Sequence, residues 1–231
     1  MILRVKFNKK GYLRYISHLD MMRLFHRSFN RGQIPIAYSE GYNPHPRFSI
    51  ANPLALGIES DEEYMDIELD FMEFQDFKEK MNSILPKDVQ IISGQWLEKE
   101  ETIDSLIAWA HYELQFKLER DHGRQEIDKI VGEWLSRDEI NINKVKRKGK
   151  KEIRRVENIR PLIGNLTVKD MDGQDIVFNS LLKAGSKGNL KPMNLMEALA
   201  RDSELGIDMD SIDIRRTGQY AERDGKIYKP L

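Results

Sequence analysis

Hydrophobic and polar residues alternate at the start of the chain. Leu3, Val5 and Phe7 are separated by polar residues, and the run 12–16 is again rich in apolar and aromatic side chains. A period of two is typical of a half-buried strand. We therefore predict a strand at the N-terminus, with 12–16 continuing in extended form or forming the second arm of a hairpin.

A helix is predicted from Ser17 to about Arg31, where apolar residues recur at helical spacing. Ser17 and Asp20 have the spacing of a capping box, and a glycine follows the last helical residue. At 100° per residue, Arg23, Arg27 and Arg31 fall together on the stripe opposite the apolar face.

The rest of the N-terminal half completes a recognisable order of elements. A turn-rich segment over 40–47 is followed by extended segments at 48–56 and 64–69, a helix at 73–85 and a closing strand at 89–97. The order strand, helix, strand, strand, helix, strand is that of the split βαβ or ferredoxin-like plan.

The same order recurs more faintly after residue 105. The candidates are strands at 111–118, 140–145, 153–156, 162–168 and 176–178, helices at 125–135 and 193–199, and a terminal hairpin that turns at Asp224-Gly225. We predict an α+β protein with two ferredoxin-like (βαββαβ) units in tandem, antiparallel sheets and helices on one face. The predicted domains are 1–104, with a basic face, and 105–231, with a basic hairpin and a C-terminal tail.

Composition narrows the chemistry. The 231 residues include no cysteine, which excludes thiolate zinc sites, cysteinyl iron–sulfur clusters and a cysteine nucleophile, and fits a reducing compartment. No apolar run approaches the roughly 18 residues of a membrane helix. We expect a cytoplasmic protein with no membrane partner and no cofactor.

Charge is strongly segregated although the formal net charge is only -1. Residues 1–50 carry nine Lys/Arg against two acids, a balance of +7, and 51–104 carry four Lys against fifteen acids, a balance of -11. Between Lys144 and Arg160 nine basic residues oppose two acids, again +7. Two basic segments favour a polyanionic partner, and the acidic 59–79 segment is expected to face a second protein or to screen them.

The predicted RNA-binding residues come from these basic segments and from the proline-braced loop Tyr38–Arg47. Tyr and His stack on unpaired bases while Asn and Arg donate hydrogen bonds, and clustered Lys/Arg hold phosphates. The loop is equally interpreted as a structural connector, and the basic hairpin as a solvated loop. The candidates are Arg4, Lys6, Arg14, Arg23, Arg27, Arg31, Tyr42, Asn43, His45, Arg47, Lys146, Arg147 and Arg154.

Histidines supply the only catalytic candidates. His18 and His45 have the chemistry of an acid–base pair for metal-independent RNA cleavage, because imidazole titrates near neutral pH. No HxxxH or HxxE spacing is present, so no metal site is predicted. Phosphate-binding and nucleophile-elbow motifs are also missing from the sequence.

Two signatures give the chain a family resemblance. The segments Tyr15–Asp20 (YISHLD) and Tyr38–Arg47 (YSEGYNPHPR), followed by Pro53-Leu54 and Gly57, resemble the radical SAM-linked protein family over residues 1–200. Members of that family occur alone or fused behind a radical SAM enzyme. The resemblance implies an association with such an enzyme and does not imply a reaction.

These observations favour an RNA-binding accessory protein that presents an RNA, tRNA or rRNA, to a separate radical SAM RNA-modifying enzyme. Two alternatives stay open. One is a metal-independent endoribonuclease similar in topology to those that process CRISPR repeats, and the other is a protein adapter without RNA contact.

Overall fold

The computed structural model describes residues 1–98, 101–148, 151–186 and 188–231, without the side chains of 145–148, 151, 153 and 154. The chain divides into two compact units. Unit 1 consists of Met1–Ala110 together with Arg215–Leu231, and unit 2 consists of His111–Ile214. The sequence analysis predicted domains 1–104 and 105–231, whereas the compact units divide after Ala110 and again before Arg215, within β10.

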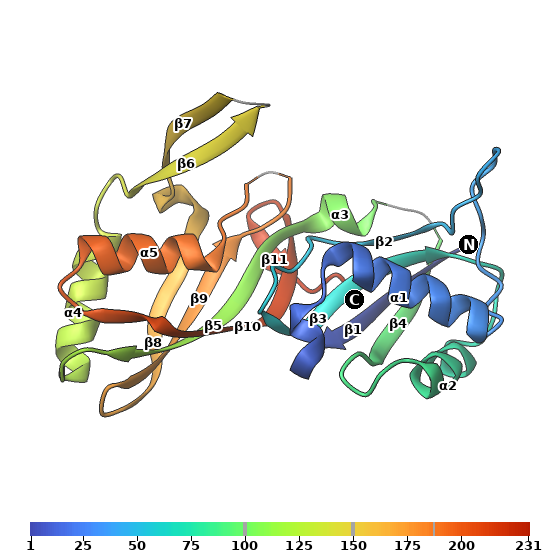
Figure 1. Ribbon diagram of the computed structural model, residues 1–231, viewed down its shortest axis with the longest axis horizontal. Coiled ribbons are helices and arrows are strands. Elements are labelled where there is room, and N and C mark those ends of the chain that lie inside the picture. The colour runs from blue at the N-terminus through green and yellow to red at the C-terminus, as the bar shows by residue number, and fades with distance from the viewer. Residues whose placement is uncertain (99–100, 149–150, 187) are drawn as a thin grey trace. The chain divides into compact units, whose positions relative to one another are not determined.

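Unit 1 follows the order β1-α1-β2-β3-α2-β4 (Figure 1). Strand β1 lies between β4 and β3 and is antiparallel to both, and β2 pairs with β3. Arg215 and Arg216, in the middle of β10, pair in parallel with the start of β3, and β11 pairs with the end of β10. The bounds are β1 Ile2–Lys9, α1 His18–Arg31, β2 Phe48–Ile50, β3 Glu59–Glu68, α2 Phe74–Ile84, β4 Ile91–Leu97, α3 Ile103–Leu106, β10 Ile207–Arg223 and β11 Lys226–Tyr228.

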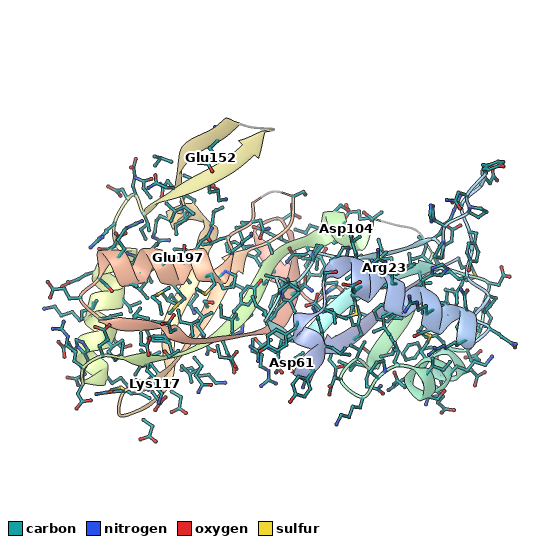
Figure 2. All side chains as sticks on the ribbon, in the orientation of Figure 1. Arg23, Asp61, Asp104, Lys117, Glu152 and Glu197 are labelled. Carbon is teal, nitrogen blue, oxygen red and sulfur yellow. The ribbon has the colours of Figure 1, made fainter. Side chains whose placement is uncertain are left out.

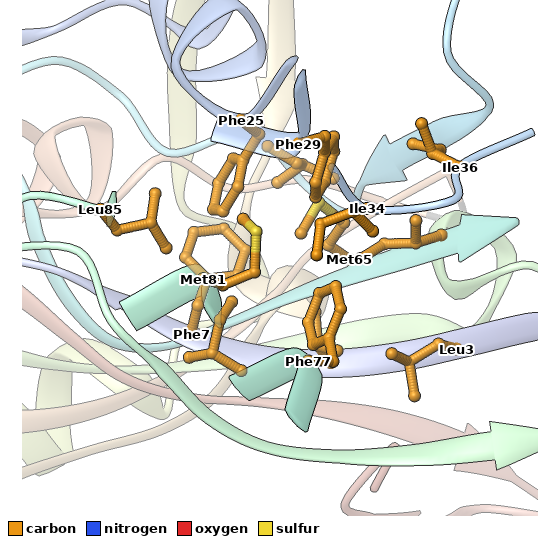
Figure 3. Packing of buried hydrophobic residues seen from close by; sticks show 14 of the residues in the cluster. Leu3, Phe7, Phe25, Phe29, Ile34, Ile36, Met65, Phe77, Met81 and Leu85 are labelled. Carbon is orange, nitrogen blue, oxygen red and sulfur yellow. The ribbon is translucent and has the colours of Figure 1, made fainter. Parts of the chain in front are cut away.

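The core of unit 1 lies between its sheet and helices α1 and α2 (Figure 3). Phe7 of β1 packs edge-to-face against Phe25 of α1, with ring centroids 4.9 Å apart, and Phe77 and Met81 of α2 are fully buried beside them. Successive side chains of a strand point to opposite faces. The predicted alternation in β1 therefore turns its apolar residues towards the helices and Arg4 towards the other face of the sheet.

Unit 2 contains a second set of strands and helices. Strand β5 lies between β10 and β9, β8 pairs with β9, and β6 and β7 form a separate two-stranded sheet. Phe116 and Phe178 pack edge-to-face in its core, and α4 buries Trp134. The bounds are β5 Ile107–Leu118, α4 Arg124–Leu135, β6 Asn141–Lys148, β7 Lys151–Asn158, β8 Ile163–Asp172, β9 Asp175–Lys183 and α5 Pro192–Asp202.

The structure confirms an α+β protein with mostly antiparallel strands. One predicted strand is wrong, because Gly11–Tyr15 forms a 3-10 helix. Gly11 has φ +54°, and its N–H donates to Glu59 Oε1 at 2.9 Å, so the chain leaves the sheet immediately after β1. None of the helices in the described part of the chain is long and apolar enough to span a membrane.

Candidate nucleic-acid interface

Helix α1 exposes a row of arginines. Its N-cap Ser17 accepts a hydrogen bond from the N–H of Asp20 at 3.1 Å, as the capping box predicts. Because the apolar side of the helix is buried, Arg23, Arg27 and Arg31 are exposed. Figure 2 labels Arg23 on this helix. Arg23 pairs with Asp20 at 2.8 Å. Hydrogen bonds from Ser17 and then from Arg23 hold the pKa of Asp20 below its ordinary value.

Arg27 and Arg31 differ from Arg23 because neither has an ion pair or hydrogen bond with another described residue. They lie one turn apart on one side of α1, where like charges destabilise a helix by a few tenths of a kcal/mol, about 0.2–0.5. An anionic ligand would remove this repulsion. These two guanidinium groups are therefore the free cations of the helix.

The loop Tyr38–Arg47 is closed at its base and exposed at its tip. Tyr38 and Pro46 form an isolated β-bridge, and the N–H of Ser39 donates to the carbonyl of His45 at 2.8 Å. The His45 N–H in turn donates a hydrogen bond to Ser39 Oγ at 3.0 Å. Figure 1 shows this segment, between α1 and β2, extending away from the sheet of unit 1. Tyr42 is fully exposed near the tip.

The base of the loop is tied to α1. The Tyr38 hydroxyl donates to Asn30 Oδ1 at 3.0 Å, and its ring lies edge-to-face with His26 at 6.4 Å between centroids. Asn30 and His26 are adjacent in sequence to Arg31 and Arg27, and each lies about 100° around the helix from its neighbour. We call this part of unit 1 the α1–loop surface; its residues are His26, Arg27, Asn30, Arg31, Tyr38, Tyr42, Asn43 and His45.

Basic residues of β1, of the segment after it and of the base of the loop form ion pairs inside unit 1. Antiparallel pairing of β1 with β3 places the predicted basic strand against the predicted acidic segment, so that opposite charges become neighbours across strands. The N–O distances are Arg4–Asp66 2.8 Å, Lys6–Glu62 3.5 Å, Lys10–Asp61 2.9 Å, Arg14–Glu59 3.9 Å and Arg47–Glu68 3.0 Å. The sequence analysis predicted that the carboxylates of 59–79 are free for a protein partner. Those of Glu59, Asp61, Glu62, Asp66 and Glu68 instead form ion pairs within unit 1. An RNA role for Arg4, Lys6, Arg14 and Arg47 stays a prediction.

A buried charge cluster lies on the helix-facing side of β3. Arg216 donates from Nη1 to both carboxylate oxygens of Glu63 at 2.9 and 3.1 Å, and Lys9 Nζ donates to the carbonyl of Ile16 at 2.9 Å. Burial raises the pKa of Glu63, opposed by Arg216, and burial lowers the pKa of Lys9. Lys9, Glu63 and His18 line a pocket of about 20 Å³, which is room for one water molecule.

The two candidate catalytic histidines occupy different settings. His18 begins α1 beside the small pocket, whereas His45 lies in the loop, which contacts α1 at Asn30. Twelve residues of helix separate His18 from Asn30, about 18 Å along the axis. No contact within the described residues joins the two histidines, and their role as an acid–base pair stays a prediction. No three His, Asp or Glu side chains of the described chain group in the manner of a metal site.

The basic segment of unit 2 forms the predicted hairpin. Strands β6 and β7 pair from Asn141↔Asn158 to Lys148↔Lys151, and Lys144 forms an ion pair with Glu157 at 2.5 Å. Lys146 and Arg147 lie in β6 and Arg154 in β7, but their side chains are outside the described part, as are residues 149–150. Their proposed contacts with RNA stay predictions.

The sequence analysis did not identify two residues that hold the base of the loop, His26 and Asn30, or the arginine of the buried charge cluster, Arg216. His26 and Asn30 have the i, i+4 spacing that places two side chains on one side of a helix, and that spacing was the available signal for the loop anchor. Arg216 had no local signal, because its partner Glu63 is 153 positions away.

A family model supplies the decisive comparison, since it matches residues 3–192. Its description is "Uncharacterized protein conserved in bacteria (DUF2344)". The chain belongs to this family. The description makes no mention of a radical SAM enzyme, so that association of the DUF2344 chain stays a prediction. No match is found among curated proteins.

Chains of three solved complexes are similar in fold to the DUF2344 chain. A chain of "Crystal Structure of a Cbf5-Nop10-Gar1 Complex" matches with a TM-score of 0.54 and 12% identity, covering 94% of this chain and 48% of that one. A chain of "Crystal structure of the archaeal box H/ACA sRNP Nop10-Cbf5 complex" matches with a TM-score of 0.51 and 12% identity, covering 94% and 47%.

A third match is to a chain of "Structure of H/ACA RNP bound to a substrate RNA containing 2'-deoxyuridine", with a TM-score of 0.50 and 11% identity, covering 94% and 47%. The DUF2344 chain thus spans about half the length of the chains it matches. At these identities the likeness concerns the fold alone.

Proposed function

We propose that this protein binds unpaired RNA at the α1–loop surface. The observation that supports this most directly is the pairing of two features in unit 1: a loop with a fully exposed Tyr42, and the helix to which that loop is tied, with Arg27 and Arg31 free. Chains of similar fold also occur in two H/ACA ribonucleoprotein structures, one of which has a bound substrate RNA.

The chemistry of the surface matches a single strand better than a duplex. An exposed tyrosine ring offers a stacking platform for a base, and stacking contributes about 1–3 kcal/mol per base. Arg27 and Arg31, one helical turn apart, suit successive phosphates, and Asn43 offers an amide to a base edge. The closed base of the loop limits the entropy lost when the strand binds.

The role of the bound RNA is the finer part of the proposal. We propose that the protein presents a tRNA or rRNA segment to a separate RNA-modifying enzyme. The resemblance of the YISHLD and YSEGYNPHPR segments to radical SAM-linked proteins supports a radical SAM enzyme as that partner.

The two units also repeat one strand order. In each unit the first strand lies between the fourth and the third: β4-β1-β3 with β2 in unit 1, and β10-β5-β9-β8 in unit 2. We interpret this as two ferredoxin-like units in tandem, and we propose the basic hairpin of unit 2 as a further RNA contact in its own unit.

The test is the salt dependence of binding to a fluorescein-labelled single-stranded RNA, followed by anisotropy. Affinity is expected to fall with salt at a log–log slope of about -0.7 for each phosphate contact, so Arg27→Ala/Arg31→Ala should reduce the slope by about 1.4. Tyr42→Ala should weaken binding by about 1–3 kcal/mol without changing the slope.

The matched control is Lys80→Ala/Lys87→Ala, which removes the same charge from two exposed positions that form no ion pair with a described residue. This variant should bind RNA with nearly the unchanged slope. Equal losses in the two double variants would mean that only net charge matters, and the assignment of the surface would be wrong. No retention of RNA at low salt would leave the adapter function.

A further inference from the structure

A second, larger pocket lies on the face of the unit 1 sheet opposite α1 and α2. Its volume is about 760 Å³, within the range of small-molecule sites. It is lined from β1, the segment around α3, and the β10–β11 hairpin. None of its residues belongs to the α1–loop surface, so the following inference does not rest on the proposed function.

Arg4 forms a rigid cationic group of the pocket. Its Nε and Nη2 donate to the two oxygens of Asp66 at 2.8 and 2.9 Å, and Nη2 also donates to the carbonyl of Glu101 at 3.0 Å. Asp66 is held in turn by the N–H of Ile103 at 2.9 Å. Nη1 has no partner among the described residues, so a buried, fixed guanidinium keeps two N–H donors for a ligand.

Two further cations stand at the β10–β11 turn. Arg223 and Lys226 are register partners on either side of Asp224-Gly225, so two like charges are directly opposed across the strands. Such a pair is destabilising. The nearest recorded carboxylate to Arg223 is Glu101 at 3.8 Å, beyond hydrogen-bond length, and Lys226 has no ion pair in the described chain. An anion between them would remove the repulsion.

The remaining walls are apolar and acidic. Leu97, Leu106 and Tyr228 offer a surface for a planar ring, and Glu101 and Asp224 add carboxylates. Carboxylates repel a bare anion but accept hydrogen bonds from hydroxyl groups. The combination therefore selects a ligand with three parts: an anion, a ring and hydroxyls.

We propose that this pocket binds a ribonucleoside monophosphate unit, with the phosphate at Arg4, Arg223 and Lys226, the base against Tyr228 and its apolar neighbours, and the ribose hydroxyls at the carboxylates. The unit is either a free mononucleotide or the 5′-phosphorylated end of an RNA. Both sources present the same chemistry to the pocket.

The experiment is calorimetric titration of the full chain with UMP, AMP, dUMP, inorganic phosphate and 5′-phosphorylated tetrauridylate. Arg223→Ala/Lys226→Ala should weaken binding of the ribonucleotides at least tenfold, as loss of charge-assisted phosphate contacts requires. Tyr228→Leu should weaken UMP and AMP about tenfold but leave phosphate unaffected. The Lys80→Ala/Lys87→Ala control should bind UMP as the parent does.

The outcomes distinguish a free mononucleotide from an RNA end, and binding in this pocket from binding at the α1–loop surface. Binding of UMP identifies a mononucleotide pocket, and binding of the tetranucleotide alone, lost in Arg223→Ala/Lys226→Ala, identifies an RNA end. Arg27→Ala/Arg31→Ala should leave UMP binding unchanged. The α1–loop surface is itself proposed to bind single strands, so the tetranucleotide is titrated in this background, with and without Arg223→Ala/Lys226→Ala. No binding of any nucleotide at millimolar concentration overturns the proposal, as does affinity for inorganic phosphate or dUMP equal to that for UMP, or unchanged affinity in Arg223→Ala/Lys226→Ala.

Discussion

Arg216 binds Glu63 through hydrogen bonds to both carboxylate oxygens, and each side chain is only 3% exposed. The same Nη1 also donates to the carbonyl of Asn52 at 3.0 Å. Breaking a buried ion pair from one side leaves an uncompensated charge. The link joins β10, near the end of the chain, to β3 of the same unit.

Arg216→Met should therefore lower the free energy of unfolding by about 3–5 kcal/mol. Glu63→Gln/Arg216→Met should recover part of this loss, because the stranded carboxylate is gone. Urea denaturation at pH 7 measures both. Lys129→Ala, which removes an exposed pair with Glu133, is the control and should change stability by less than about 0.5 kcal/mol. A single variant as stable as the parent contradicts the prediction.

Acid should destabilise unit 1 partly through Asp61. Burial raises the pKa of Asp61, but hydrogen bonds from Arg215 and Lys10 outweigh it and hold the pKa below its ordinary 3.8. A carboxyl with a lowered folded pKa contributes stability that is present above its unfolded pKa and is lost as the pH falls through the folded pKa.

In Asp61→Asn the loss of stability between pH 7 and pH 3 should therefore be smaller than in the parent, measured as the shift in urea midpoint. Asp70→Asn, at an exposed carboxyl that forms no ion pair within the described part of the chain, should retain the parental pH dependence. Parallel curves for parent and Asp61→Asn would show that the Arg215 and Lys10 contacts do not stabilise the ionised carboxylate.

Gly94 should not tolerate a side chain. It lies opposite Val5 in the β1–β4 pair, and an added Cβ would lie 2.8 Å from Phe74 Cδ2 and 3.1 Å from the carbonyl oxygen of Arg4. Phe74 can shift, but the backbone of β1 cannot do so without strain.

Gly94→Ala should thus lower stability by about 1–3 kcal/mol, the range of overpacking. Gly132→Ala is the matched substitution, since nothing lies within 4 Å of its Cβ in α4. It should raise stability by up to about 1 kcal/mol through helix propensity. Thermal melting measures the stability of both variants. Equal changes in stability for Gly94→Ala and Gly132→Ala would contradict the close packing at Gly94.

Tyr38→Phe tests whether anchoring of the loop matters to RNA. The substitution keeps the ring beside His26 but removes the hydroxyl bond to Asn30. Loss of one exposed hydrogen bond of about 1 kcal/mol should lower RNA affinity up to about fivefold and speed amide exchange in 39–46. Tyr12→Phe, at an exposed tyrosine without a recorded partner, should do neither. Faster amide exchange in 39–46 with unchanged RNA affinity would show that anchoring of the loop does not contribute to RNA binding.

Local signals in the sequence predicted the elements that local physics determines. The helix from Ser17 to Arg31 was confirmed, because its cap and its apolar stripe are encoded within a few residues. The turn at Asp224-Gly225 was confirmed for the same reason, since both residues take positive φ. The run 12–16 was wrong because Gly11 turns the chain through a contact with Glu59, 48 positions away.

The candidate site was only partly predictable. The arginine row and the exposed Tyr42 follow from helical spacing and from a proline-rich loop, and the structure exposes them as expected. The pairing of Arg4 with Asp66 and of Arg216 with Glu63 depends on which strands become neighbours in the sheet. That choice is made by the whole fold, so counting charges along the chain overestimates the net positive charge that a ligand meets.

Strand β10 has a consequence for biosynthesis. Residues up to Ile214 belong to one unit and those from Arg215 to the other, so unit 1 is discontinuous in the chain. As the polypeptide leaves the ribosome, the first 110 residues emerge long before Arg216, and Glu63 has no arginine to neutralise it during that interval. The N-terminal unit consequently reaches its final form only after the intervening unit has been translated.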